Sequence, residues 1–268
     1  MAIQTLYTAA TGMISLESKL DVIANNLANM ETTGFKRGRA NFEDLFYRTD
    51  QMPGTQDSAG EYTPVGTQIG LGAKVSSTQS DVYTPGAIEL TNRELDVAIQ
   101  GNGYFQVMDP SGDTYYTRAG NFSRNANGNL VAGSAATGRL LEPPISIPTD
   151  ALAVSITAEG QVSVRLPNNN TLQPVGTIQL ARFINPEGLM QLGENLLAET
   201  DASGPPTTGN PGQDGLGALR QGNLEKSNVE PVTEIIDLIT TQRAFEMNSK
   251  AIQTGDELLQ VVANLKRY

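Results

Sequence analysis

The chain has 268 residues, no cysteine, histidine or tryptophan, and a formal net charge of −11. The missing cysteine and histidine exclude disulfides, a zinc site and nucleophilic catalysis by Ser-His-Asp or Cys-His groups. Residues 41–224 hold nine basic and nineteen acidic side chains, so the chain lacks the basic surface that nucleic-acid binding requires.

Neither membrane insertion nor a secretory signal is predicted. No stretch approaches the roughly 20 apolar residues that a transmembrane helix needs. The N-terminus has no positively charged leading region, and Glu17, Lys19 and Asp21 interrupt any apolar run. We therefore expect that any export of this chain proceeds without a cleavable signal peptide.

Residues 3–29 are predicted to form a long helix with a heptad seam, because its apolar residues alternate in spacings of three and four. The seam residues are Leu6, Ala9, Met13, Leu16, Leu20, Ile23 and Leu27. Gly34 is the expected left-handed stop, with Asn29 as an alternative cap. The basic run 36–39 is interpreted as solvated cations near the helix C-terminus, with an anion-binding patch as the alternative.

Residues 41–90 are predicted to be an extended arm or linker. Between residues 48 and 66 the sequence is mostly Gln, Asp, Ser, Thr, Gly and Pro, with little to bury. Such a segment cannot offset its ordering entropy with a core of its own. We therefore expect either a disordered linker or an arm that becomes ordered only against a partner surface.

Residues 91–200 are predicted to form short strands separated by turns. Residues 95–99, 104–108 and 175–183 predict strands, while 154–156 and 162–166 predict a hairpin closed by Glu159-Gly160. The turn spacing is typical of an antiparallel sandwich or a small barrel. Residues 201–224 are rich in Gly, Pro and Asn and are interpreted as a return linker.

A second long helix is predicted to open near Pro231, which occupies a first-turn position. Its apolar residues keep the heptad alternation, with Thr254 at one polar position. These residues are Ala244, Met247, Ala251, Leu258, Val261 and Leu265. Neither helix can bury its seam alone. Two seams of this kind, together with an arm that has no core of its own, favour packing between copies. The alternative is a helical pair within one chain that only completes a single domain.

The predicted fold is therefore α+β, with long terminal helices in a coiled-coil layer and an inserted sandwich-like or barrel-like antiparallel β domain. Residues 1–40 and 225–268 form a discontinuous helical domain, 41–90 the arm and 91–224 the β-rich domain. No catalytic, cofactor-binding or metal site is predicted. Residues 109–113 lack the distal glutamate of a calcium loop and predict a β-turn, and residues 101–103 lack the third glycine of a dinucleotide loop.

Three stretches resemble bacterial flagellar axial proteins, the family of rod and hook subunits. Residues 24–29 (ANNLAN) and 32–37 (TTGFKR) are similar to the family's N-terminal signature. Residues 227–229 (SNV) and 241–251 (TQRAFEMNSKA) are similar to its C-terminal signature, and 96–107 with 116–118 (YTR) to its central domain. The chain length and the segment 42–47 (FEDLFY) leading into 48–66 most resemble the distal-rod members.

The resemblance implies a structural subunit, not an enzyme, that polymerises into a rigid hollow drive shaft and transmits torque from motor to hook. It implies a place in the periplasmic rod of the flagellar basal body, with the seam residues at the subunit interface. Implied partners are other copies, proximal-rod and hook proteins, outer-membrane and peptidoglycan ring proteins, and the flagellar type III export apparatus. The implied rod-stiffening insertion includes Arg48, Met52, Pro53, Tyr62, Pro64 and Gly66.

Two alternatives remain open from the sequence. A proximal-rod or hook subunit of the same family would be similar at both ends of the chain. A secreted carbohydrate-binding or hydrolytic β domain with helical dimerisation ends is a different class. Only 6% of the residues are aromatic, whereas sugar-binding platforms usually need exposed rings. Tubes in electron micrographs would favour the axial family, and discrete dimers the secreted domain.

Overall fold

The computed structural model describes residues 2–54, 65–167 and 169–265. The chain divides into two compact units. The first unit contains residues 1–28, 38–79 and 230–268, and the second contains residues 29–37 and 80–229. The chain therefore passes from one unit to the other four times.

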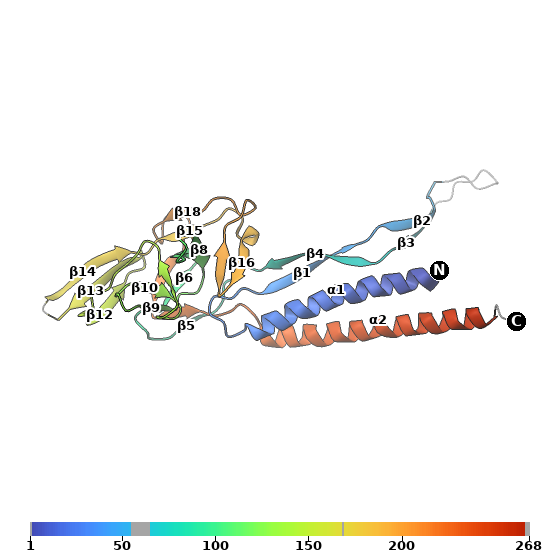
Figure 1. Cartoon of the computed structure of the whole chain (residues 1–268). Helices are drawn as coiled ribbons and strands as arrows, with labels where there is room; N and C mark the ends of the chain where they lie inside the picture. The colour runs from blue at the N-terminus through green and yellow to red at the C-terminus, as the bar shows by residue number, and fades with distance from the viewer. Residues whose placement is uncertain (1, 55–64, 168, 266–268) are drawn as a thin grey trace. The chain divides into compact units, whose positions relative to one another are not determined.

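Two helices, α1 (Ala2–Ala28) and α2 (Pro231–Leu265), lie side by side in the first unit (Figure 1). The predicted helix over 3–29 and the first-turn position of Pro231 are confirmed. Three contacts define an antiparallel pairing, namely Leu6 with Gly255, Gly12 with Asn248, and Asn26 with Glu234. Each helix therefore has a partner within the chain.

The face of α2 that packs on α1 differs from the seam predicted from apolar spacing. It repeats every seven residues, and its members are Glu234, Leu238, Thr241, Phe245, Asn248, Ile252, Gly255 and Leu259, all buried or half-buried. Glu234 and Thr241 are only 1% and 3% exposed. Half of this face is polar or small, so a search for apolar periodicity does not find it.

The first unit also contains a β-ribbon, defined here as residues 38–54 and 65–80. Its strands are β1 (Gly38–Asp44), β2 (Tyr47–Gln51), β3 (Thr67–Gly70) and β4 (Ala73–Ser80). β1 pairs with β4, and β2 pairs with β3. Residues 48–51 pair with residues 67–69 of the same chain, so the predicted linker or partner-ordered arm is wrong there. Residues 55–64 lie outside the described part of the chain.

Asn26, one residue of the ANNLAN signature, joins three segments of the first unit. Its side-chain amide donates to the Gly38 carbonyl and its side-chain oxygen accepts from the Gly38 N–H, both at 2.8 Å. This is the pairing that a neighbouring strand would offer. The same amide donates to the Glu234 carboxylate at 3.2 Å, so α1, β1 and α2 meet at one buried side chain.

The second unit consists of short strands that pair antiparallel. They are β5 (Ile88–Leu90), β6 (Val97–Gln100), β7 (Tyr104–Met108), β8 (Thr114–Thr117), β9 (Phe122–Arg124), β10 (Leu130–Ala132), β11 (Arg139–Leu141), β12 (Ala153–Ile156), β13 (Gln161–Leu166), β14 (Asn169–Thr177), β15 (Leu180–Arg182), β16 (Met190–Gly193), β17 (Leu196–Ala198), β18 (Thr207–Gly209), β19 (Ala218–Gln221) and β20 (Asn223–Glu225). A short 3-10 helix, η1, spans Pro186–Gly188.

The largest sheet of this unit has nine strands, with the order β16-β17-β8-β7-β11-β10-β9 and with β15 pairing with both β7 and β18. Strands β12, β13 and β14 form a three-stranded sheet, β19 pairs with β6, and β20 pairs with β5. Side chains from several sheets enclose one apolar core. In it the rings of Phe105 and Phe122 pack edge to face with centroids 4.9 Å apart.

Several predicted strands and turns of this unit are confirmed. The hairpin of β12 and β13 places Ser155 opposite Ser163, with Gly160 at φ 86° in its turn. Residues 109–113 form the predicted turn between β7 and β8. Two predictions are wrong. Residues 175–183 belong to two strands, β14 and β15, and residues 201–224 contain β18, β19 and most of β20, so they are not a linker.

Candidate functional site

One face of α2 carries large apolar side chains that the rest of the described chain leaves exposed. They are Val232, Ile235, Ile236, Ile239, Met247, Leu258 and Val261, here called the outer stripe. At about 100° per residue, they fall on the side of the helix opposite to the face that packs on α1. Four of them gather over residues 232–239, and the exposed residues Arg243, Glu246 and Lys250 separate these four from Met247 and Met247 from the last two. Clusters of exposed large apolar side chains mark contact sites, so the outer stripe is a candidate contact surface for another chain.

The residues predicted to form the subunit interface divide between the two helix faces. The α1 set is half-buried, with Ile23 fully buried, because α1 packs within the first unit. In the α2 set, Ala244 is half-buried and Ala251 is exposed, and Met247, Leu258 and Val261 belong to the outer stripe. The side chain of Leu265 lies outside the described residues. The α1 seam therefore packs partly within the chain, and its role at a subunit interface stays a prediction.

The residues predicted to form a rod-stiffening insertion are only partly described. Arg48, Met52 and Pro53 are exposed and Gly66 is half-buried, whereas Tyr62 and Pro64 lie outside the described residues. The backbone of Gly66 lies close to that of Gln51. Glycine is needed there, because a Cβ would collide with the carbonyl oxygen of Gln51. A role in stiffening stays a prediction.

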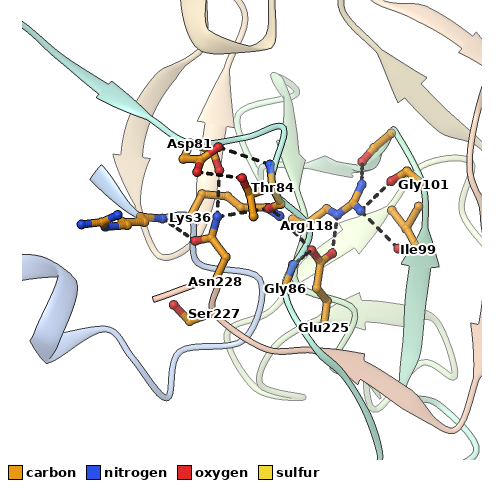
Figure 2. A network of polar contacts seen from close by, with 12 residues as sticks. Lys36, Asp81, Thr84, Gly86, Ile99, Gly101, Arg118, Glu225, Ser227 and Asn228 are labelled. Atoms are coloured by element: carbon orange, nitrogen blue, oxygen red, sulfur yellow. Dashed lines mark hydrogen bonds and ion pairs between the residues drawn. The ribbon is translucent and has the colours of Figure 1, made fainter. Parts of the chain in front are cut away.

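A buried ionic cluster of Lys36, Arg118 and Glu225 lies in the second unit (Figure 2). The Glu225 carboxylate lies 2.8 Å from Lys36 Nζ and 2.5 Å from Arg118 Nε, and its side chain is 1% exposed. The backbone N–H of Gly86 donates to the same carboxylate at 3.0 Å. Arg118 also donates to backbone carbonyls in the 99–103 turn. Every charge in the cluster is therefore paired.

The electrostatics of the cluster favour the ionised form of Glu225. Burial alone would raise its pKa, but the charges of Arg118 and Lys36 and their hydrogen bonds outweigh burial, so the pKa of Glu225 lies below its ordinary value. Burial lowers the pKa of Lys36, and the attraction of Glu225 offsets part of that effect. Removing either Glu225 or Lys36 would therefore leave the other charge buried without its partner, which is strongly destabilising.

Asn228 extends the cluster to the segments by which the chain enters and leaves the second unit (Figure 2). Its side-chain oxygen accepts from the Arg37 N–H at 2.7 Å, and its amide donates to the carbonyls of Asp81 and Thr84. Residues 37, 81 and 228 lie within two residues of three of the four crossings between the units. The second unit therefore fixes these segments with a single polar network.

Gly34 completes this arrangement. It has the predicted left-handed conformation, with φ 71°, and its N–H donates to the Glu225 carbonyl at 2.8 Å. A Cβ at this position would lie 2.8 Å from the carbonyl carbon of Arg118. Glycine is required both for the backbone angle and for the close approach of two segments.

Sequence reasoning missed the cluster. The sequence favours solvated cations for the basic run 36–39. Lys36 is instead largely buried in an ion pair with Glu225, so that interpretation is wrong for this residue. Arg118, Glu225 and Asn228 are far apart in sequence, and no periodic pattern links them. The one available signal was that Lys36, Arg118 and Asn228 all lie within the motifs that resemble the axial family.

Among the described residues, no group of three or more acidic side chains is arranged to hold a metal ion. Likewise, neither of the helices in the described ranges is long and apolar enough to cross a membrane.

Three protein-family descriptions match parts of the chain. "Flagella basal body rod protein" matches residues 6–36, and "Flagellar hook protein FlgE/F/G D1 domain" matches residues 98–164. "Flagellar basal body rod FlgEFG protein C-terminal" matches residues 220–265. These three segments include Asn26, Lys36, Arg118 and Glu225, the polar residues that organise the two units.

Relatives match along nearly the whole chain. The flagellar basal-body rod protein FlgG of Caulobacter vibrioides is 47% identical over 264 residues, which are 98% of this chain and 99% of the relative. FlgG of Bacillus subtilis is 42% identical over 99% of this chain and 100% of its own. A solved structure, the flagellar hook protein FlgE2 of Helicobacter pylori, is 14% identical with a TM-score of 0.25 over 71% of this chain and 43% of that chain, too distant to inform the fold. The identities and their full coverage place this chain in the FlgG family of flagellar basal-body rod proteins.

Proposed function

We propose that this protein is a structural subunit of the distal rod of the flagellar basal body. Many copies would form a rigid hollow helical shaft that transmits torque from the motor to the hook. The observation that carries the proposal is the outer stripe of α2, which the rest of the described chain leaves uncovered in a member of a rod-protein family. The role is mechanical and requires no reaction chemistry.

The helices would supply the inner coiled-coil layer of this shaft. In this proposal the helices of the predicted domain, residues 1–40 and 225–268, form the helical layer, whereas residues 29–37 and 225–229 of that domain belong to the second unit. α1 and α2 would be paired inside each subunit, with the outer stripe packed on neighbouring subunits. An apolar stripe that meets a different surface of the next copy makes a heterologous contact, which repeats along a helix without closing. That geometry suits an open-ended tube.

The remaining parts would lie outside the helical layer. The β-rich part, residues 91–224, would act as a sandwich-like or barrel-like outer domain, an idea supported by several sheets around one core. Within the predicted arm of residues 41–90, the β-ribbon would reach neighbouring subunits, whereas residues 80–90 belong to the second unit. Partners beyond the homopolymer would be proximal-rod and hook proteins, the surrounding ring proteins and the flagellar export apparatus, in the periplasmic rod.

The proposal is tested by electron microscopy of the purified chain at high concentration. We expect straight hollow tubes, because the outer stripe can be covered only by other copies. Discrete dimers would contradict the proposal and would favour a helical dimerisation module instead.

Deletion of residues 48–66 is expected to leave a folded chain that still polymerises, but into flexible tubes. After the deletion, Tyr47 is joined by Thr67, Gln68 and Ile69 to its ribbon partner Gly70, which is an acceptable three-residue hairpin loop. The outer stripe is untouched, so assembly persists while contacts made by the arm are lost. Tube curvature in electron micrographs measures the effect.

Tubes as straight as those of the unaltered chain would refute the stiffening role of residues 48–66. A suitable control replaces exposed residues Arg48 and Asp50 with serine while keeping the ribbon length. Because that change removes only an exposed ion pair, it is expected to leave the tubes straight.

A further inference from the structure

The second unit contains a groove with a volume of about 650 Å³. Its rim carries Tyr83 and Ile184, which are exposed, and Ile184 is 85% exposed. Its lining also includes Tyr104 and Arg118, which are largely buried, and Arg182, which is exposed. All residues that line it belong to the second unit, so the groove does not depend on how the two units are placed.

The hydroxyl of Tyr104 gives this groove an unmet polar requirement. Tyr104 is 5% exposed, and its hydroxyl has no hydrogen-bond partner among the described residues. Burial raises the pKa of Tyr104 to about 12, so the hydroxyl keeps its proton and can donate. A buried donor without an acceptor destabilises the folded chain, and an occupant that offers an acceptor would relieve that cost.

The charges that line the groove are mainly positive. Lys36, Arg118 and Arg182 stand against a single carboxylate, Glu225. Glu225 pairs with Lys36 and Arg118, and none of the ion pairs among the described residues includes Arg182. The groove therefore suits an occupant with apolar side chains and an acidic group.

A segment with that chemistry is exposed on the β-ribbon of the same chain. Phe42, Phe46 and Tyr47 lie around the bend between β1 and β2, and Phe46 is 88% exposed. Glu43 on this bend is paired with Lys74, at 3.2 Å. The Asp44 carboxylate accepts a hydrogen bond from the Tyr47 hydroxyl but has no cationic partner among the described residues. We call residues 42–47 the acidic bend. Exposed aromatic anchors beside a charge are typical of contact hot spots.

We infer that the acidic bend of one copy docks in the groove of a second copy. Phe46 would pack between Tyr83 and Ile184, and the Asp44 carboxylate would face Arg182 and accept from the Tyr104 hydroxyl. This inference rests on the proposed function and names one of the contacts between subunits. The contact joins two different surfaces, so it can repeat along a polymer without closing.

Disulfide cross-linking between copies tests this contact. Because the chain has no cysteine, each single substitution introduces the only thiol. Chains with Phe46→Cys and chains with Ile184→Cys, of different mass, are mixed, assembled and oxidised. We expect dimers with one chain of each kind, several-fold above those from Phe46→Cys mixed with Leu152→Cys, a control on the second unit that is also exposed, at 63%.

Charge reversal gives an independent arm of the test. Asp44→Arg in the first chain, or Arg182→Asp in the second, is expected to lower the cross-link yield several-fold, and the two together are expected to restore it. Tubes without cross-linking above the Leu152→Cys control would overturn the docking and leave the proposed function intact. Protection of Ile184→Cys from maleimide without cross-linking would reveal a different occupant, and would also overturn it. If the unaltered chain forms no polymer, the proposed function fails and this inference fails with it.

Discussion

Met247→Asp is expected to abolish polymerisation while leaving the subunit folded. Met247 is 65% exposed and lies in the outer stripe, so an aspartate there is solvated in the single chain. In the polymer the same carboxylate would be buried against apolar side chains without a partner, which costs about 3–5 kcal/mol. The critical concentration for assembly should rise about a hundredfold or more, as measured by sedimentation.

Two controls separate assembly from folding. Leu152→Asp adds the same charge in place of an apolar side chain of similar exposure, 63%, on the second unit and outside the outer stripe, and should polymerise almost normally. Leu20→Asp is expected to act differently, because Leu20 is half-buried within the first unit. It should disturb the helical pair itself as well as assembly, and circular dichroism would detect the loss of helix. Unchanged polymer yield with Met247→Asp would contradict the role of the outer stripe.

Glu225→Ala is expected to destabilise the second unit by about 3–5 kcal/mol. The change leaves the buried cations Lys36 and Arg118 without their shared carboxylate, and the Gly86 N–H without its acceptor. Chemical denaturation of the full chain, with amide exchange of β6 and β7 as the local probe, measures the loss of stability of the second unit separately from that of the helices.

The matched control for this change is the neighbouring ion pair between Lys226 and Glu89, in which both side chains are about half exposed. Glu89→Ala should have little effect, because exposed pairs contribute little to stability. The pKa of Glu225 is lowered in the folded chain, so its contribution is fully present above about pH 4.3 and is lost as the pH falls through the folded-state pKa. The stability gap between the unaltered chain and Glu225→Ala should therefore narrow in acid, and a gap independent of pH would contradict the role of the cluster.

The parts of the fold that local chemistry determines were predictable. The first helix, the first-turn Pro231, the left-handed Gly34 and the hairpin around Gly160 each depend on short-range spacing or on one backbone angle. Such features carry their own signal in a window of a few residues. They were confirmed within one or two positions.

The parts that depend on distant residues were not predictable by the same means. The face of α2 that packs on α1 includes Glu234, Thr241 and Asn248, which a hydrophobic pattern excludes. Glu234 is tolerated there because Asn26, which also binds Gly38, donates to its carboxylate. The apolar stripe that the sequence does reveal, including Met247 and Leu258, points the other way.

Low apolar content was misleading in two segments. Residues 48–54 have little to bury, and residues 201–224 bury chiefly Leu216 and Leu219. Both segments still contribute strands, because backbone pairing with a neighbouring strand satisfies their polar groups. Glycine and proline in these segments mark turns between short strands. The same reasoning applies to Lys36, whose partner Glu225 lies far away in sequence.

The two units suggest how a rod subunit would bear load. In the second unit, one polar network holds Arg37, Asp81 and Asn228, close to three of the points where the chain leaves it. In the first unit, Asn26 joins α1, β1 and α2. Load passing through either unit therefore meets hydrogen-bonded junctions, and the outer stripe would pass it to the next copy.

The most direct test of this account is a reconstruction of the assembled tube from electron micrographs at side-chain resolution. The account predicts that Met247, Leu258 and Val261 are enclosed between helices of adjacent copies. A tube in which these three side chains face solvent, with copies joined only through their β-rich units, would contradict it.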